Sequence, residues 1–200
     1  MFYQFPIEIL TDSGLVTIDC DQDDVYWIKQ KQPSFSSILE GAIIADLLSI
    51  DACEIDERYP IQVVSTGLPV IIVPIKKLSA LKKVKIDHGI YYELIEELEA
   101  KGICVFSTET YSKRADINVR DFAPYYGIDE DATTGSSNGS ILAYLKRYKV
   151  FQSKNLNLIS EQGYEIKRPS TLYLRSIDKD MYVGGKIKKV PKGEWFLNNT

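Results

Sequence analysis

The residues with the clearest chemical character lie in one short run, GIDEDATTGSSNGS, at positions 127–140. A helix that begins near Gly135 or Ser136 would point its unpaired backbone N–H groups, and the positive end of its dipole, at whatever lies in front of Thr134. A carboxylate or phosphate would be stabilised there, and Gly135 permits close approach to the backbone. The run is therefore a candidate anion-binding site.

Hydroxyl and acidic side chains extend the chemistry of this run. Thr134, Ser136 and Ser137 add hydroxyl donors. Glu130 and Asp131 can hold a water molecule or an ammonium group, or transfer a proton if one of them is desolvated. A plainer interpretation stays open, in which Thr134 or Ser136 only caps the helix and the acids favour its N-terminus. Spacing alone favours the plainer interpretation.

The elements next to the run must hold it in place. The apolar residues between 141 and 148 recur at helical spacing. We therefore predict a buried helix from Gly135 to about Val150. Residues 138–140 have small side chains, which add little bulk at the start of the helix. The anion site would then lie inside a cleft.

The rest of the chain indicates short strands interleaved with helices. We predict one helix from Ser37 to about Ile50, and another that Asp87 caps and Lys101 ends. The expected strands are 7–10, 15–19, 25–35, two within 61–75, 103–109, 156–163, 170–177 and 181–190. This pattern predicts a mixed α/β protein with many antiparallel connections.

Composition limits the class of protein. The chain of 200 residues is 44% hydrophobic and 26% charged, which is the profile of a soluble globular protein. Its formal net charge of -4, without a large basic cluster, argues against nucleic acid as a partner. Cys20, Cys53 and Cys104 have no CxxC spacing, so we expect no disulfide framework, no metal site and a cytoplasmic location. No run is long and apolar enough to suggest a membrane span.

The segment VRDFAPYYGIDEDATTGSSNGSILAYL, at 119–145, resembles the signature of the PhzF-like phenazine-biosynthesis isomerases, which have the diaminopimelate epimerase fold. That signature has the form R-x-F-x-P…G-x-x-E-D-x-x-T-G-S. Three further segments, at 64–75, 161–174 and 183–195, resemble other family segments in the same order. The residues at the signature positions are Arg120, Phe122, Pro124, Gly127, Glu130, Asp131, Thr134, Gly135 and Ser136.

The resemblance implies an α+β fold of the diaminopimelate epimerase type. A mixed, mostly antiparallel sheet would wrap around a central helix, and the first of two related domains would be largely missing. Residues 1–33 would be the remnant hairpin of the N-terminal domain, and 34–200 the C-terminal domain, whose last strands can return to the first. The similar runs at 9–15 and 158–164 fit either a duplicated domain or chance.

The resemblance also implies an isomerase or epimerase of biosynthesis that transfers a proton on a small carboxylated metabolite without cofactor or metal. Asp131 and Ser136 match catalytic positions, and Gly135 and Ser136, with Thr134, would bind the substrate carboxylate. Arg120 would organise the loop by pairing with Asp131 or Glu130.

The family's acid/base glutamate and its Gly-His-Ala-Thr turn have no counterpart in this sequence, so the chain would carry the C-terminal half of an active site. A homodimer or a separately encoded N-terminal half would complete it. We expect the N-terminal hairpin to seek such a partner through its apolar residues, Phe5, Ile7, Ile9, Val16, Ile18, Val25 and Trp27. The alternative is a non-catalytic, small-anion-binding or degenerate remnant. His88 is expected to be a solvated residue at a helix terminus, and Cys104 a buried thiol.

Overall fold

The computed structural model describes residues 5–11, 14–188, 190–191 and 193. Its strands are β1 (Ile7–Thr11), β2 (Gly14–Cys20), β3 (Val25–Lys29), β4 (Ser34–Leu39), β5 (Ile61–Ser65), β6 (Pro69–Pro74), β7 (Gly102–Ser107), β8 (Ile117–Ala123), β9 (Ile128–Asp131), β10 (Asn157–Gln162), β11 (Ser170–Ile177) and β12 (Asp180–Lys186). Its helices are α1 (Gly41–Leu47), α2 (Leu78–Leu81), α3 (His88–Glu96) and α4 (Gly135–Arg147), with 3-10 turns η1 (Ala52–Glu54) and η2 (Pro124–Tyr126). Within the described ranges, no helix is long and apolar enough to cross a membrane.

The described strands form one mixed sheet. Its order is β1-β2-β3-β12-β11-β10-β8-β7-β6-β5-β4, and β9 pairs with β8 beside this path. The β6–β7 and β8–β10 pairs are parallel, and the other pairs are antiparallel. The expected α+β fold with a mostly antiparallel sheet is therefore confirmed.

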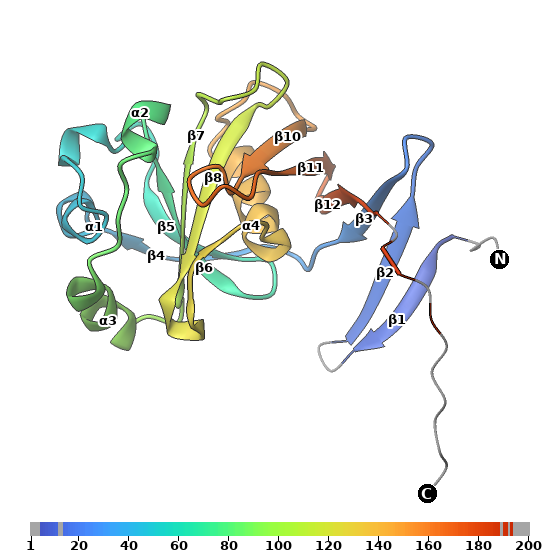
Figure 1. The fold of residues 1–200 in the computed structure, drawn as a ribbon, viewed down its shortest axis with the longest axis horizontal. Helices are drawn as coiled ribbons and strands as arrows, with labels where there is room; N and C mark the ends of the chain where they lie inside the picture. The colour runs from blue at the N-terminus through green and yellow to red at the C-terminus, as the bar shows by residue number, and fades with distance from the viewer. Residues whose placement is uncertain (1–4, 12–13, 189, 192, 194–200) are drawn as a thin grey trace, which may run out of the picture.

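The sheet curves around α4, which contacts β5 and β6 on one side and β11 and β12 on the other (Figure 1). Every residue of α4 from Ser137 to Leu145 is buried. Side chains alternate along a strand, so Val70 and Ile72 of β6 pack in the α4 cluster. The segment after Gly135 is thus a central helix, as the apolar stripe predicted.

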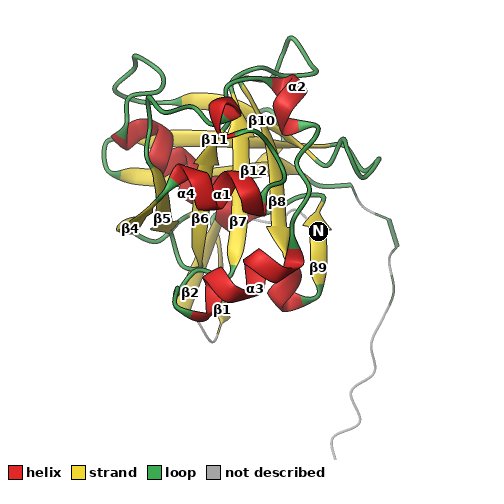
Figure 2. Ribbon diagram, turned by 90° about the vertical axis from the view of Figure 1, so that its left-hand side faces the viewer, coloured by secondary structure: helices red, strands yellow, loops and turns green. Residues whose placement is uncertain are grey.

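The opposite face of the same strands carries a second core. Ile71 and Val73 of β6 point to this face, where α1, α2 and α3 cover β5 to β8 (Figure 2). Both faces of β6 are therefore buried, which explains its continuous apolar sequence PVIIVP. The two cores fix β8 and its neighbours between α4 and the other helices.

Two predicted helices have different bounds in the structure. Residues from Ser37 to Leu39 belong to β4, in which Ile38 and Leu39 pair with β5, and α1 begins only at Gly41. The helix capped by Asp87 ends at Glu96, and Lys101 donates from outside it to the carbonyl oxygens of Ile95 and Leu98. Strand pairing and a long side chain that reaches back account for the two differences.

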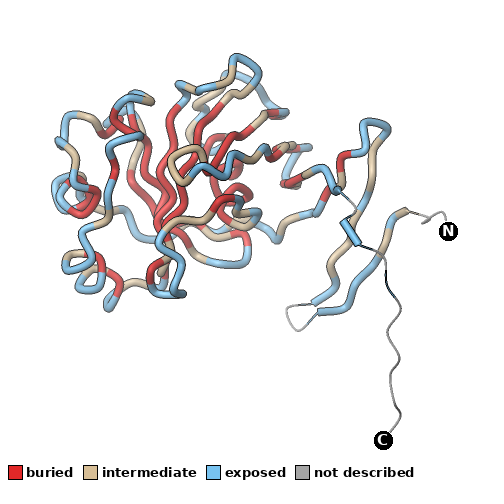
Figure 3. The backbone as a smooth tube through the Cα atoms, in the orientation of Figure 1, coloured by how far each residue is buried: buried red, intermediate tan, exposed pale blue. Residues whose placement is uncertain are grey.

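The N-terminal hairpin projects from the main body (Figures 1 and 3). Ile9 and Leu15 are exposed, and Leu10 is 82% exposed. Val25 and Trp27 were expected to contact a partner, but both are buried within this chain. Strand β12 pairs with β3, which carries them, and Trp27 lies edge-on to Tyr173 of β11. The domain boundary near residue 33 stays a prediction.

Candidate functional site

The first turn of α4 is open at its N-terminal end. Thr134 occupies the N-cap position of the plainer interpretation, but its side chain makes no capping hydrogen bond. Its hydroxyl instead donates to Oδ2 of Asp131 at 2.6 Å. Gly135 is exposed, and a Cβ built on it would have no atom within 4 Å. First-turn amides have no acceptor within their own helix, so those of Gly135 and Ser136 are available to an external anion.

A buried amide, Gln162 at the end of β10, holds this turn. Its Nε2 donates to the carbonyl oxygen of Asp131 (2.8 Å) and to the Thr134 hydroxyl (3.1 Å). Its Oε1 accepts from the Thr134 backbone N–H (3.3 Å) and from Asn138 Nδ2 (3.0 Å). All four hydrogen-bonding directions of the amide are used, which fixes Asp131 relative to α4. The sequence assigned no role to Gln162, although the family-like segment at 161–174 contains it.

The turn between β5 and β6 touches the same helix. A Cβ on Gly139 would lie 2.7 Å from Gln30 Oε1 and 2.9 Å from Thr66 Oγ1, so a larger residue would displace these two side chains. The Thr66 hydroxyl lies 3.4 Å from the carbonyl oxygen of Ser136 and 3.5 Å from Ser140 Oγ. The family-like segment at 64–75 thereby reaches the site, a contact between distant residues that spacing alone did not indicate.

Arg120 forms an ion pair with Glu130, one of the two partners that the sequence left open. Its Nε and Nη2 donate to the Glu130 carboxylate at 2.9 and 2.7 Å, and the two side chains are 7% and 8% exposed. Its Nη1 donates to the carbonyl oxygens of Leu81 (3.0 Å) and Val84 (2.9 Å). This arrangement ties β8 and β9 to the loop after α2.

Three side chains form a row across β7, β8 and β9 beneath α4. Asp121 is opposite Cys104 on one side and opposite Asp131 on the other. Burial raises the pKa of Asp121 to about 6; hydrogen bonds from Ser137 and Cys104 oppose this rise, and the charges of Asp131 and Glu130 add to it. The sequence did not single out Asp121, although an acid between Arg120 and Phe122 in an apolar strand was the available signal.

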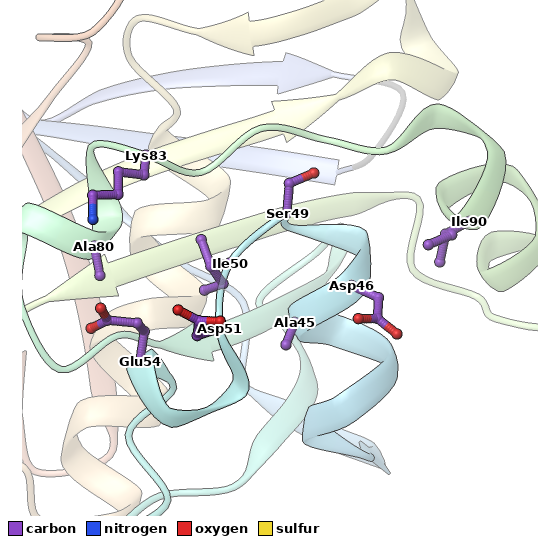
Figure 4. Close-up of a pocket in the computed structure, with 9 residues that line it drawn as sticks. All are labelled: Ala45, Asp46, Ser49, Ile50, Asp51, Glu54, Ala80, Lys83 and Ile90. Atoms are coloured by element: carbon purple, nitrogen blue, oxygen red, sulfur yellow. The ribbon is translucent and has the colours of Figure 1, made fainter.

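His88 and Cys104 are in the environments that the sequence predicted for them. His88 is exposed at the first position of α3, and Cys104 is fully buried, which raises the pKa of its thiol well above the usual range. Figure 4 shows a pocket of about 580 Å³ among α1, η1 and α2, and none of the candidate residues lines it. In the part of the chain that the structure describes, no three metal-binding side chains gather closely enough to hold an ion.

The fold is a curved mixed sheet that surrounds one central helix, and the first turn of that helix has no side-chain cap. Residues 4–191 match the PhzC-PhzF family, described as phenazine biosynthesis-like protein. The chain belongs to this family.

Its relatives carry isomerase names. The chain is 29% identical to an uncharacterized isomerase of Clostridium acetobutylicum, over 94% of this chain and 67% of that protein. It is 30% identical to the uncharacterized isomerase YfhB of Bacillus subtilis, over 90% and 61%. It is 28% identical to the trans-2,3-dihydro-3-hydroxyanthranilate isomerase of Pseudomonas chlororaphis, over 60% and 40%. The matches thus span from two fifths to two thirds of these relatives.

Solved structures show the same fold. The PhzF-family phenazine biosynthesis protein of Bacillus anthracis superposes with a TM-score of 0.81 at 24% identity, over 93% of this chain and 67% of that one. A PhzF-family protein of Enterococcus faecalis superposes with a TM-score of 0.69 at 18% identity, over 98% and 67%.

Proposed function

We propose that this chain carries the C-terminal half of the active site of an isomerase or epimerase, which moves a proton on a small carboxylated metabolite without a cofactor. One observation carries the proposal: the uncapped first turn of α4 lies next to the carboxylate of Asp131, which Thr134 and Gln162 hold in place. A substrate anion and a proton acceptor can therefore meet at one helix end. The isomerase names of the relatives support the same reaction class.

The residues have distinct roles in this reaction. The amides of Gly135 and Ser136, next to Thr134, bind the substrate carboxylate, and each such charge-assisted bond contributes about 1.5–3 kcal/mol. Asp131 takes or returns the proton as a general acid/base, and the Ser136 hydroxyl orients the reacting group. Arg120 stays outside the chemistry and holds the strand that carries Asp131 through its pair with Glu130.

A second acid/base group must face Asp131 across the substrate. In our proposal it comes from a polypeptide that packs on the N-terminal hairpin, either a separately encoded N-terminal half or a second copy of this chain. Exposed apolar side chains at Ile9, Leu10 and Leu15 support such a contact. The cytoplasm is the proposed location, because Cys20, Cys53 and Cys104 are free thiols.

Hydrogen exchange tests the proposed chemistry. The chain is incubated in D2O with trans-2,3-dihydro-3-hydroxyanthranilate, L-amino acids and lactate, and the loss of each C–H signal is followed by proton NMR. We expect exchange into one of these carboxylates, and at least a ~100-fold loss of rate in Asp131→Asn. Asp129→Asn is the matched control, because Asp129 is exposed on the same strand. An equal rate in the Asp131 variant would remove Asp131 from the mechanism.

The second candidate function is a small-anion binder without catalysis. The same open turn of α4 favours it, because binding needs only the Gly135 and Ser136 amides, whereas exchange needs a complete acid/base pair. Anion binding without any exchange, by a chain that sedimentation shows to be a dimer, is the result that selects this function.

Replacing Gly135 with valine is expected to abolish binding of a small carboxylate, because a branched side chain would fill the open space in front of the α4 amides. Ser136→Ala should weaken binding only modestly, since the backbone amide remains. Lactate is titrated into labelled chain, and the amide NMR shifts of α4 are followed. Gly41→Val is the matched control, because Gly41 also begins a helix and has equally open space at its Cβ. If the amide shifts of α4 in the wild-type chain do not change at tens of millimolar lactate, the motif only begins a helix and does not bind an anion.

A further inference from the structure

The row of Cys104, Asp121 and Asp131 places a buried acid behind the proposed anion site. Asp121 is 3% exposed, and its Oδ2 has no hydrogen-bond partner among the described residues. Directly opposed residues on paired strands have Cβ atoms about 4.5–5.5 Å apart, so the Asp121 and Asp131 side chains are neighbours on the face that α4 covers. An unpartnered, enclosed carboxylate oxygen is costly, and its presence here needs a physical reason.

Among the residues that the structure describes, no cation neutralises Asp121. From β7 it faces the thiol of Cys104, and from α4 the hydroxyl of Ser137. From β9 it faces Asp131, and the charge of the neighbouring Glu130, which is paired with Arg120, also acts on it. An anion at the start of α4 would therefore add negative charge next to Asp131 and close to the buried carboxyl of Asp121.

We propose that Asp121 is a positioning residue that couples anion binding at Gly135 and Ser136 to the uptake of one proton, through its contacts with Ser137 and Asp131. The inference rests on the proposed function, because it assumes the anion site at α4. Protonated Asp121 removes one negative charge from beneath the first turn of α4, and the bound anion favours the protonated form. By linkage, each change strengthens the other.

The coupling predicts that small anions bind more tightly as the pH falls. Lactate and sulfate stay ionised between pH 5 and 7.5, so their own protonation does not contribute. We expect the Kd of each anion to rise about fivefold or more between pH 5 and 7.5, a factor typical of coupled sites. The midpoint should lie near 6, where burial places the pKa of Asp121. Binding is measured by calorimetry in two buffers of different ionisation enthalpy, which also reports the proton uptake.

Three variants separate Asp121 from other causes. Asp121→Asn should remove both the pH dependence and the proton uptake. In the wild-type chain the hydrogen bond from Ser137 lowers the pKa of Asp121, so Ser137→Ala should raise that pKa and move the midpoint to higher pH. This variant still tests the inference if Asp121→Asn does not fold. His88→Gln is the control, since His88 is the single histidine of the sequence. It should keep the dependence of the wild-type chain.

The outcomes distinguish the inference from the function on which it rests. Anion binding that does not change with pH, or a dependence that persists in Asp121→Asn, overturns the role of Asp121 and leaves the anion site intact. Loss of the dependence in His88→Gln assigns it to the histidine and also overturns the inference. Absence of lactate and sulfate binding at every pH overturns the anion site, and the inference falls with it.

Discussion

Arg120→Met lowers the free energy of unfolding by an expected 3 to 5 kcal/mol, roughly the cost of leaving one partner of a buried ion pair uncompensated. The variant leaves the Glu130 carboxylate, whose side chain is 8% exposed, without its ion-pair partner Arg120. It also removes the donor to the carbonyl oxygens of Leu81 and Val84. Urea unfolding followed by tryptophan fluorescence measures the loss.

The second change, Glu130→Gln in the Arg120→Met background, should recover part of this loss, because it neutralises the stranded acid. Lys154→Ala is the contrasting case: it breaks a pair with Asp178 in which both side chains are exposed, and stability should hardly change. If Arg120→Met were no more harmful than Lys154→Ala, the ion pair would not be the support of the site that its geometry describes.

Asp121→Asn is expected to stabilise the protein at neutral pH. The folded chain raises the pKa of this carboxyl from 3.8 to about 6, so the folded state holds the proton more tightly than the unfolded state. The resulting stability is fully present below about pH 4 and is lost as the pH rises through about 6. A neutral amide avoids that loss, which amounts to about 3 kcal/mol at pH 7.5.

The gain from Asp121→Asn should shrink to about half at pH 5 and nearly vanish near pH 4. Urea unfolding at the three pH values measures it, with Asp129→Asn as an exposed control. A gain of the same size at every pH would trace the effect to packing, and a loss of stability at pH 7.5 would contradict the cost of the buried charge.

The sequence predicted those parts of the fold that depend on local pattern. The apolar stripe after Gly135 marked the central helix, and Asp87 marked the start of α3, as its bond to the Ile90 amide confirms. Residues 37–39 were misassigned, because helical spacing continued through them while pairing with β5 made them a strand. That pairing joins segments that local periodicity does not relate.

The candidate site was predictable where it lies in one continuous run. Asp131 and Thr134 both lie in that run and contact each other, although the motif itself did not specify this contact. Gln162 and Asp121 were missed because their roles depend on burial and on cross-strand neighbours, which only the folded sheet determines. Whether Arg120 would bind Glu130 or Asp131 was open for the same reason.

The pairing of β12 with β3 also has a consequence for how the chain folds. Lys29 is opposite Tyr182 in the sheet, and its side chain bonds to Asp180, 151 residues later in the chain. The hairpin is synthesised well before the strand that attaches it to the sheet, because 151 residues separate Lys29 from Asp180. Contacts over such separations form slowly, because the whole intervening loop must close before they stabilise anything. The hairpin is therefore expected to reach its final place only after β12 has been made.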